Sequence, residues 1–323
     1  MAHQLLIDNK NGNVWDLSGV VTEVSYKTAL IGKPSSLEFT FIKDGLYESK
    51  DFQINMGDIV SYKADKKKVF YGYVFSINSG QSKEVKVKAY DQIRYLMKPD
   101  TKRFVGKTAS QIVKQLGNEL KLKLGNIEDT GYKIPKVLHD NKTYIDMISD
   151  ALDRTLINYL TNFMLYDDFG SINLTNTSKL QYDKIIGQGS LMTDYTFDRS
   201  IDSDTYNQIK LYKDNKETGK REIYIAKDSG SIKDWGLLQL YQSVDEGMNE
   251  AQIKVMLENL LTTKNRETKK ISIEAIGDFN LRAGYYAHID IPELMLQRYM
   301  LISECEQKVS GDIHTMKLDL VVI

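Results

Sequence analysis

The chain has 323 residues, 41% hydrophobic and 27% charged, which is the composition of an ordinary globular protein of about two domains. Its 43 Lys and Arg nearly balance 44 Asp and Glu, and the net charge of −1 argues against a nucleic-acid-binding protein, whose binding domain is usually clearly basic. The single cysteine, Cys305, excludes an intramolecular disulfide, and the lack of a long apolar run or of a basic, apolar leader predicts neither a membrane anchor nor Sec export.

The N-terminal part of the chain has the pattern of a small β module. Apolar residues recur in four short runs, and Gly57 and Gly80 mark turns or places of close backbone approach. A short helical exit is expected at residues 91–97, before Pro99, because a proline disfavours helix at the residue that precedes it. The runs predict strands at residues 37–41, 54–60, 69–75 and 85–89.

The middle of the chain changes to a helical period. Thr108 is the expected N-cap of a helix with one apolar face, and Thr143 with Asp146 has the pattern of a capping box for a second helix. A hairpin is expected next, with strands at residues 162–166 and 171–174. The Asp-Phe-Gly triplet in its turn is not a kinase signature, because the glycine-rich and His-Arg-Asp loops of a kinase are missing upstream.

The last third of the chain returns to strands. Residues 207–212 and 222–226 predict a hairpin with a long polar loop, and a helix is expected at residues 248–263. A turn is expected at Ser310-Gly311. A second block of strands surrounds this turn, at residues 271–275, 281–287, 299–302 and 316–320.

The two blocks of strands share one order of features. Each has an alternating strand, a strand entered through an apolar-x-x-Gly sequence, a Tyr-rich strand, a Ser-Gly turn and a closing strand. We therefore predict an α+β protein in which two related small antiparallel β-barrels flank a helix-containing middle domain. The expected domains are residues 1–98, 99–203 and 204–323, with the helix at residues 248–263 inserted into the last.

No group of residues predicts a reaction or a bound cofactor. The four histidines share no metal-ligand spacing, and Gly187-Gln188-Gly189 lacks the context of a dinucleotide loop. Glu274 and Asp278 could be imagined as a glycosidase acid/base pair. The first alternates outward on a predicted strand and the second lies in a turn, so solvated carboxylates are favoured. We expect no catalytic, metal-binding or cofactor-binding residue.

Candidate assembly residues come from the lysines and tyrosines of the two blocks. The chain has 20 tyrosines, and tyrosine suits both half-buried sheet faces and protein interfaces. The lysine run between the second and third strands is typical of a charged hairpin tip, with an assembly contact as the alternative. The candidate interface residues are Lys66, Lys67, Lys68, Tyr71, Tyr73, Tyr285, Tyr286 and Tyr299.

Several strings, in their order and spacing, resemble hub proteins of the PBSX-type XkdQ/YqbQ group. Residues 85–96, ending in Ala-Tyr-Asp-Gln-Ile-Arg-Tyr-Leu, resemble the end of that family's first barrel. Residues 204–209 resemble the start of its second barrel, and residues 236–239 and 274–284 resemble later landmarks. The last string is also similar to the Gly-Asp-x-x-Leu-Arg-x-Gly pattern of late control D proteins, with Ala283 where a proline is common.

The resemblance covers nearly the whole chain and implies a phage tail hub-like fold. It implies the central baseplate hub of a contractile phage tail or of a phage-tail-like particle (bacteriocin), assembled in the bacterial cytoplasm. Such hubs carry two small barrels per chain and form homotrimers that adapt a six-fold tail tube to a three-fold spike. The implied partners are a second and third copy, a spike protein below and a tail tube or tube-initiator protein above. Tape-measure and baseplate wedge proteins are further candidates, while nucleic-acid recognition, membrane anchoring and cofactors are not implied.

Two other functions stay open at this point. A tail-tip cell-wall hydrolase would turn over peptidoglycan, and a carbohydrate- or receptor-binding module would use a β-rich, Tyr-rich surface. Neither accounts for the repeated block of strands, so the structural hub without enzymatic activity is favoured.

Overall fold

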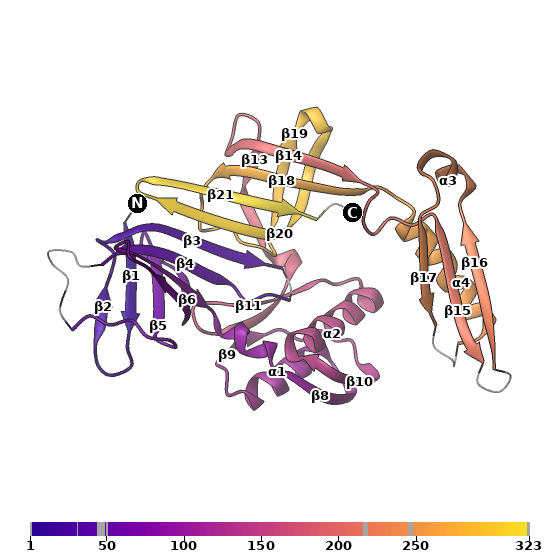
Figure 1. Cartoon of the computed structure of the whole chain (residues 1–323), viewed down its shortest axis with the longest axis horizontal. Helices are drawn as coiled ribbons and strands as arrows, with labels where there is room; N and C mark the ends of the chain where they lie inside the picture. Colours follow the sequence, from indigo (N-terminus) through magenta and orange to yellow (C-terminus); the bar gives the residue numbers. More distant parts are fainter. Residues whose placement is uncertain are drawn as a thin grey trace. The chain divides into compact units, whose positions relative to one another are not determined.

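The computed structural model describes residues 2–30, 32–43, 49, 51–215, 219–244 and 248–321. The chain forms two compact units, of which unit 1 comprises residues 1–195 and 272–321 and unit 2 comprises residues 196–271 (Figure 1). Strands contain 52% of the residues and helices 20%, so the protein is mostly β. The expected domain boundaries after residues 98 and 203 stay a prediction.

A 13-stranded sheet contains both of the strand blocks expected from the sequence. Its N-terminal strands are β1 (His3–Asp8), β2 (Val14–Asp16), β3 (Val21–Ala29), β4 (Ser36–Ile42), β5 (Ile59–Ala64), β6 (Lys67–Ser79) and β7 (Glu84–Tyr90). Its C-terminal strands are β13 (Gln181–Gly187), β14 (Met192–Ser200), β18 (Thr268–Ile276), β19 (Tyr286–Ile291), β20 (Leu296–Ser310) and β21 (Ile313–Leu320), with the short helix η3 (Pro292–Leu294) before β20.

The two halves of this sheet have the same strand order. The N-terminal module, defined as β1 and β3 to β7, runs β3-β4-β7-β6-β5-β1, and the C-terminal module, defined as β13, β14 and β18 to β21, runs β14-β18-β21-β20-β19-β13. The strands also follow one another along the chain in the same sequence. One difference is that β1 pairs with β5 antiparallel, whereas β13 pairs with β19 parallel. Closure of each module into a barrel stays a prediction.

The repeat extends to single hydrogen bonds. The Gly57 N–H donates to the Val74 carbonyl at 2.8 Å, and the Gly284 N–H donates to the Ile302 carbonyl at 2.9 Å. Both glycines have left-handed backbone, with φ of +82° and +87°, and a bulge follows Val74 and Ile302 alike. The apolar-x-x-Gly entry predicted from the sequence is therefore the same structural feature in both modules.

The strands form because one side chain in two is apolar and faces the core. In β4, Leu37, Phe39 and Phe41 are buried, while Glu38 is exposed on the other face. The expected strands at residues 54–60 and 281–287 are misplaced, since β5 begins at Ile59 and β19 at Tyr286. The left-handed glycine in each entry turn separates the strand from the residues before it.

The middle of unit 1 joins two helices to two small sheets. Thr108 and Thr143 are N-caps, and Thr143 forms a capping box with Asp146, as the sequence predicts; the structure adds a second capping box between Thr108 and Gln111. Strand β8 pairs with β10, and β12 lies between β11 and β9. The elements are η1 (Gln92–Met97), β8 (Pro99–Lys107), α1 (Ala109–Glu119), β9 (Leu124–Ile127), β10 (Ile134–Thr143), α2 (Tyr144–Tyr159), β11 (Phe163–Asp167), β12 (Ile172–Asn176) and η2 (Thr177–Lys179).

Unit 2 contains the whole connection between β14 and β18, together with the end of β14 and the start of β18. Its sheet has the order β16-β15-β17, and α4 covers one face of it (Figure 1). Ile209 and Leu211 of the sheet pack with Ile253 and Leu257 of the helix. The predicted hairpin and helix are confirmed in β15 (Gln208–Asn215), β16 (Lys220–Lys227) and α4 (Glu250–Lys264), accompanied by α3 (Ser229–Trp235) and β17 (Gln239–Ser243). Within the described residues, none of the helices is long and apolar enough to cross a bilayer.

Candidate assembly surfaces

The two modules are joined edge to edge inside one chain. Strand β20 pairs with β3 antiparallel, from Glu304 opposite Ala29 to Ser310 opposite Glu23. An ion pair of 3.1 Å between Lys27 and Glu306 crosses this joint. Backbone pairing of this kind needs no particular side chain, so any equivalent strand edge offers the same joint.

Two edges of the 13-stranded sheet match the strands of the internal joint and are open in the part of the chain that the structure describes. β14 is the last strand of the sheet order and pairs with β18 alone. In β6, the stretch Ser76–Ser79 pairs with β7 on one side, while pairing with β5 ends at Tyr73. In the shared strand order β14 corresponds to β3, and β6 corresponds to β20, so the two open edges are equivalent to the two strands of the internal joint.

One face of the sheet formed by β20, β3, β4, β7 and β6 is polar and hollowed into a groove. Ion pairs of 2.7 Å between Lys88 and Glu38 and 3.5 Å between Lys308 and Glu23 cross it. Exposed pairs of this kind add little stability, but they keep the face hydrated and nearly neutral. The residues that line it are Glu23, Ser25, Lys27, Glu38, Phe39, Thr40, Ser76, Asn78, Lys86, Val87, Lys88, Glu306 and Lys308.

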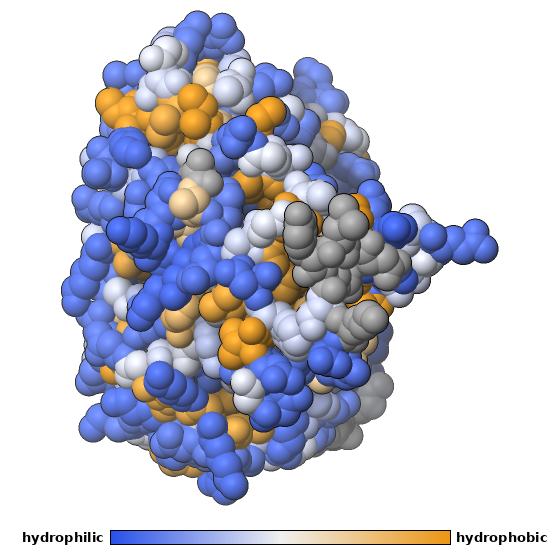
Figure 2. All heavy atoms as spheres, turned by 90° about the vertical axis from the view of Figure 1, so that its left-hand side faces the viewer, coloured by the Kyte–Doolittle hydropathy of each residue, from blue (hydrophilic) through white to orange (hydrophobic). Residues whose placement is uncertain are grey.

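The surface on the side of β1 and β2 is mainly hydrophilic. Figure 2 shows apolar side chains there in separate small patches rather than in one continuous area. The described part of this face therefore lacks the large apolar area that would mark an obligate interface.

The predicted lysine tip lies at the β5–β6 turn, with Lys66 in the turn and Lys67 and Lys68 already in β6. All three are exposed. Lys67 bonds to Asn280 of the C-terminal module, and the Lys68 ammonium lies 5.3 Å from the ring centre of Phe169. The run is a hairpin tip, as the simpler interpretation holds, and its role in assembly stays a prediction.

Tyr71 and Tyr73 belong to a row of aromatic rings on β6. Tyr71 lies 5.6 Å from Phe169 and 6.3 Å from Tyr73, which lies 5.6 Å from Tyr95. Tyr71 also packs on Gly170, where an added Cβ would lie 2.7 Å from its ring. These half-buried tyrosines therefore hold the β11–β12 turn against β6, and a further contact with another copy is untested.

The other three predicted tyrosines lie around β19 and β20. Tyr285 and Tyr286 are half-buried, and the Tyr286 N–H donates to the Leu180 carbonyl at 2.8 Å. Tyr299 is 56% exposed and lies edge-on to His288 at 5.3 Å. The eight candidates lie on both modules, and their role in assembly stays a prediction.

A buried polar junction, which the sequence did not reveal, joins the middle of unit 1 to both modules. The Arg282 guanidinium donates to the Asp167 carbonyl at 3.2 Å and lies 4.7 Å from the ring centre of Tyr166. Nearby, the Asp91 carboxylate accepts the Ser35 and Ile93 N–H groups, each at 3.0 Å. Burial and the neighbouring Asp167 raise the pKa of Asp91 to about 7. Arg282 belongs to the Leu-Arg-x-Gly string of the family resemblance, which is the signal that could have singled it out.

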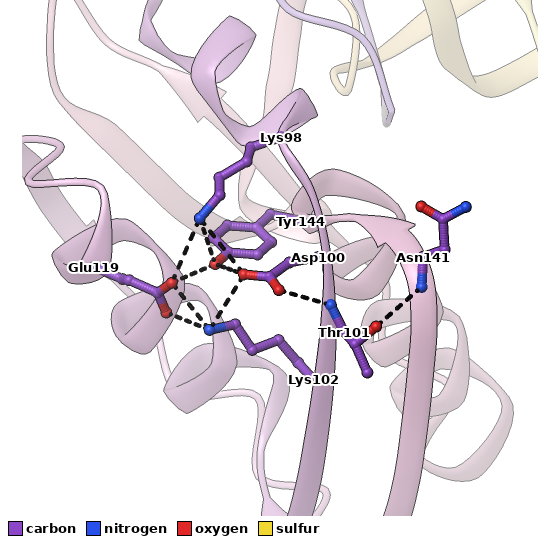
Figure 3. A network of polar contacts seen from close by, with 7 residues as sticks. All are labelled: Lys98, Asp100, Thr101, Lys102, Glu119, Asn141 and Tyr144. Atoms are coloured by element: carbon purple, nitrogen blue, oxygen red, sulfur yellow. Dashed lines mark hydrogen bonds and ion pairs between the residues drawn. The ribbon is translucent and has the colours of Figure 1, made fainter.

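A second polar network ties α1 and α2 to β8 (Figure 3). The Tyr144 hydroxyl lies 2.8 Å from an Asp100 oxygen and also contacts Glu119. Lys98 and Lys102 approach the same carboxylates, at 3.5 Å and 2.9 Å. Hydrogen bonding to Tyr144 lowers the pKa of Asp100 to about 2. Because every charge is paired, the network fastens elements together and leaves no free base or nucleophile.

Glu274 and Asp278 do not have the surroundings of a glycosidase acid/base pair. Glu274 is exposed on β18, whereas Asp278 accepts bonds from Tyr182 at 2.8 Å and Lys184 at 2.6 Å. Burial opposes ionisation of Asp278, but the Lys184 bond and its other donors outweigh it and lower its pKa. Among the described residues no group of His, Cys, Asp and Glu could hold a metal ion.

The doubled sheet with its helical middle part is the fold of phage tail proteins. The structure aligns with the 43 kDa tail protein of prophage MuSo2 from Shewanella oneidensis at a TM-score of 0.71, covering 98% of each chain at 13% identity.

The chain matches the model of the YqbQ-like family over residues 24–321 and belongs to that family. It is 31% identical to the protein YqbQ of Bacillus subtilis (strain 168) over 84% of this chain and 82% of the relative. It is 28% identical to the phage-like element PBSX protein XkdQ of the same strain over 94% and 92% of the two chains. The name of the second relative places that protein in a phage-like element.

Proposed function

We propose that this chain is the central baseplate hub of a contractile phage tail or tail-like particle, where three copies form a ring between a six-fold tail tube and a three-fold spike. The observation that carries the proposal is the duplicated strand order, with the two modules paired through β3 and β20. A ring of three copies contains six modules, so one side of the ring can present six similar surfaces to a six-fold partner.

The internal joint supplies the geometry of the contact between copies. β14 has the place of β3 in the C-terminal module, and β6 has the place of β20 in the N-terminal module. Antiparallel pairing of β14 with Ser76–Ser79 of the next copy would repeat the joint around the ring. The edges of β14 and of Ser76–Ser79 would then both be covered, so neither could pair with the strands of an unrelated protein.

The polar groove is assigned to the channel side of the ring. Its near-neutral, hydrated surface suits a passage, because strongly charged or apolar walls would bind whatever moves through. In this role the protein catalyses no reaction. Its partners are its own copies, a spike protein and a tail tube or tube-initiator protein, with tape-measure and wedge proteins nearby, and its place is the virion or tail-like particle.

Disulfide cross-linking in assembled particles tests the ring. Asn78→Cys combined in turn with Thr196→Cys, Asp198→Cys and Ser200→Cys should give covalent trimers at one position of the series. Each single variant should stay monomeric on a denaturing gel, because Cys305 is buried. Particles that contain the chain but give no cross-link in any combination, or a cryo-EM map without three copies around the axis, would refute the proposal.

A further inference from the structure

The sheet of unit 2 has two faces of different character. Alternate residues of its strands pack against α4, among them Ile209 and Leu211 of β15 and Tyr224 of β16. The residues between them point to the opposite face, which we call the outer face of unit 2. On such a solvated face polar residues are the usual choice.

The outer face instead presents apolar side chains at its centre. Ile223 and Ile225 of β16 are 50% and 53% exposed, and Tyr241 of β17 is 46% exposed. The register places Ile223 opposite Tyr212 of β15, and Ile225 and Tyr241 on either side of Lys210. The apolar area therefore crosses all three strands, and a strand added at the β16 edge would leave Tyr241 uncovered.

Positive charge surrounds this apolar centre. The Lys210 ammonium lies 5.4 Å from the ring centre of Tyr241, and Lys227 is exposed at the end of β16. The Arg221 guanidinium lies 4.0 Å from the ring centre of Tyr212 and also binds Asp214 at 2.7 Å and 2.9 Å. Three cations against one carboxylate leave the outer face with two positive charges in excess.

We propose that the outer face of unit 2 docks an acidic, amphipathic segment of another protein of the particle. The apolar side of the segment would cover Ile223, Ile225 and Tyr241, and its carboxylates would meet Lys210 and Lys227. This contact goes beyond the proposed ring, in which the copies meet through the strands of the two modules.

Other occupants fit the face less well. A second copy docked face to face would set Lys210 and Lys227 against the same cations, which is unfavourable. A sugar would need a free aromatic ring face, whereas Arg221 lies over the ring of Tyr212, and the ring of Tyr241 packs against Tyr212 with Lys210 beside it. A nucleic acid would gain nothing from the exposed isoleucines and would meet too little positive charge.

Site-specific photo-cross-linking tests the contact in cells that produce the full chain and in purified particles. A photoreactive phenylalanine analogue replaces Ile225, and in a matched variant it replaces Val255, which is 57% exposed on α4 of the same unit. We expect the first variant to cross-link to an acidic segment of a different protein and the second not to do so. Lys210→Glu with Lys227→Glu should reduce the yield about tenfold, because the reversed charges repel the segment.

Several results would overturn the inference. They are cross-links from position 225 to a copy of this chain or to nucleic acid, equal yields at the two positions, or no cross-link at position 225 in particles that contain the chain. If circular dichroism shows that the charge-reversed variant misfolds, the single Lys227→Glu change at the end of β16 takes its place. Failure of the proposed ring would be detected separately by the cysteine experiment. Its positions lie in β6 and β14, and not on the strands β15, β16 and β17 that form the outer face.

Discussion

Two glycines at matching places in the modules meet different surroundings. Gly57 has open space where a Cβ would stand, whereas a Cβ on Gly284 would overlap Sδ of the buried Met164. Both have positive φ, which costs a non-glycine residue about 1–2 kcal/mol. The shared conformation reflects the repeat, and the difference reflects the middle part of unit 1 that packs on one module.

We predict that Gly57→Ala lowers the free energy of unfolding by about 1–2 kcal/mol and that Gly284→Ala lowers it by about 1–3 kcal/mol more, because the methyl group also displaces Met164. Urea denaturation measures both. In a Met164→Ala background the extra cost at position 284 should disappear. Equal costs of the two changes in the wild-type background would contradict the structure.

The raised pKa of Asp91 gives a pH dependence of known sign. The pKa is about 7 in the folded chain and about 4 when unfolded, so this carboxyl's contribution to stability is complete below about pH 4 and is lost as the pH rises through about 7. Asp91→Asn removes that loss and keeps a side-chain oxygen that can cap η1, because asparagine and aspartate are about equally good N-caps. The variant should therefore gain on the wild type from pH 5 to about pH 7 and the difference should level off above that, as followed by urea denaturation.

Asp100→Asn is the matched control for that experiment. Hydrogen bonding to Tyr144 holds the pKa of Asp100 at about 2, so the carboxyl stays ionised throughout the range from pH 5 to pH 8. Its loss should change stability by a constant amount over that range. A sloping difference for Asp100→Asn, or a flat one for Asp91→Asn, would show that the buried junction is not built as described.

In the β5–β6 turn, Lys66 occupies a position whose left-handed backbone conformation favours glycine. Asp65 and Lys66 have φ of +46° and +68°, the conformation of the two-residue hairpin turn that prefers Asn-Gly or Asp-Gly. Lys66→Gly should therefore raise the free energy of unfolding by about 1 kcal/mol. If the lysine tip serves assembly, the same change should reduce incorporation into particles.

Lys66→Ala separates the two effects, because it removes the ammonium but keeps a side chain at positive φ. It should reduce incorporation as much as Lys66→Gly without raising the thermal unfolding temperature. Full incorporation of both variants would remove the lysine tip from the list of assembly contacts.

Helices were predicted more closely than strands because their signals are local. Thr108 and Thr143 lie three residues from the partners that complete their capping boxes, so the sequence shows both members of each pair. Strands depend on distant partners. β8 and β10 have mostly exposed or half-exposed side chains and show no apolar alternation, so the sequence does not predict them and only their pairing defines them.

At the scale of the whole molecule, the repeat was visible in the sequence but its joint was not. The four strands of each block were recognised from Gly57, Gly284 and the alternation around them, whereas β3 and β14 were missed. β3 carries the joint between the two modules, and β14 is the strand to which we assign the proposed joint between copies. Pairing of Thr28 with Cys305, 277 residues apart, depends on the shape of two finished modules, and no short pattern encodes it.

Unit 2 occupies one connection of the repeat. The connection between β3 and β4 comprises residues 30–35, whereas the equivalent connection between β14 and β18 comprises residues 201–267. The ends of this insertion lie close together. Arg199 donates two bonds of 2.7 Å to Glu267, and the Thr268 hydroxyl donates to the Ser200 carbonyl at 2.9 Å. A short loop could therefore close the gap.

Replacing residues 201–267 with a Gly/Ser loop of about six residues should leave both modules folded, because each keeps all its strands. The shortened chain should unfold cooperatively and still form the β14 to β6 cross-links of the ring. It should lose any partner that docks on the outer face of unit 2. The protein that cross-links at position 225 should therefore be absent from particles that contain the shortened chain. A shortened chain that aggregates, although the same loop placed between β3 and β4 is tolerated, would show that unit 2 supports the fold of the C-terminal module rather than adding a separate surface to it.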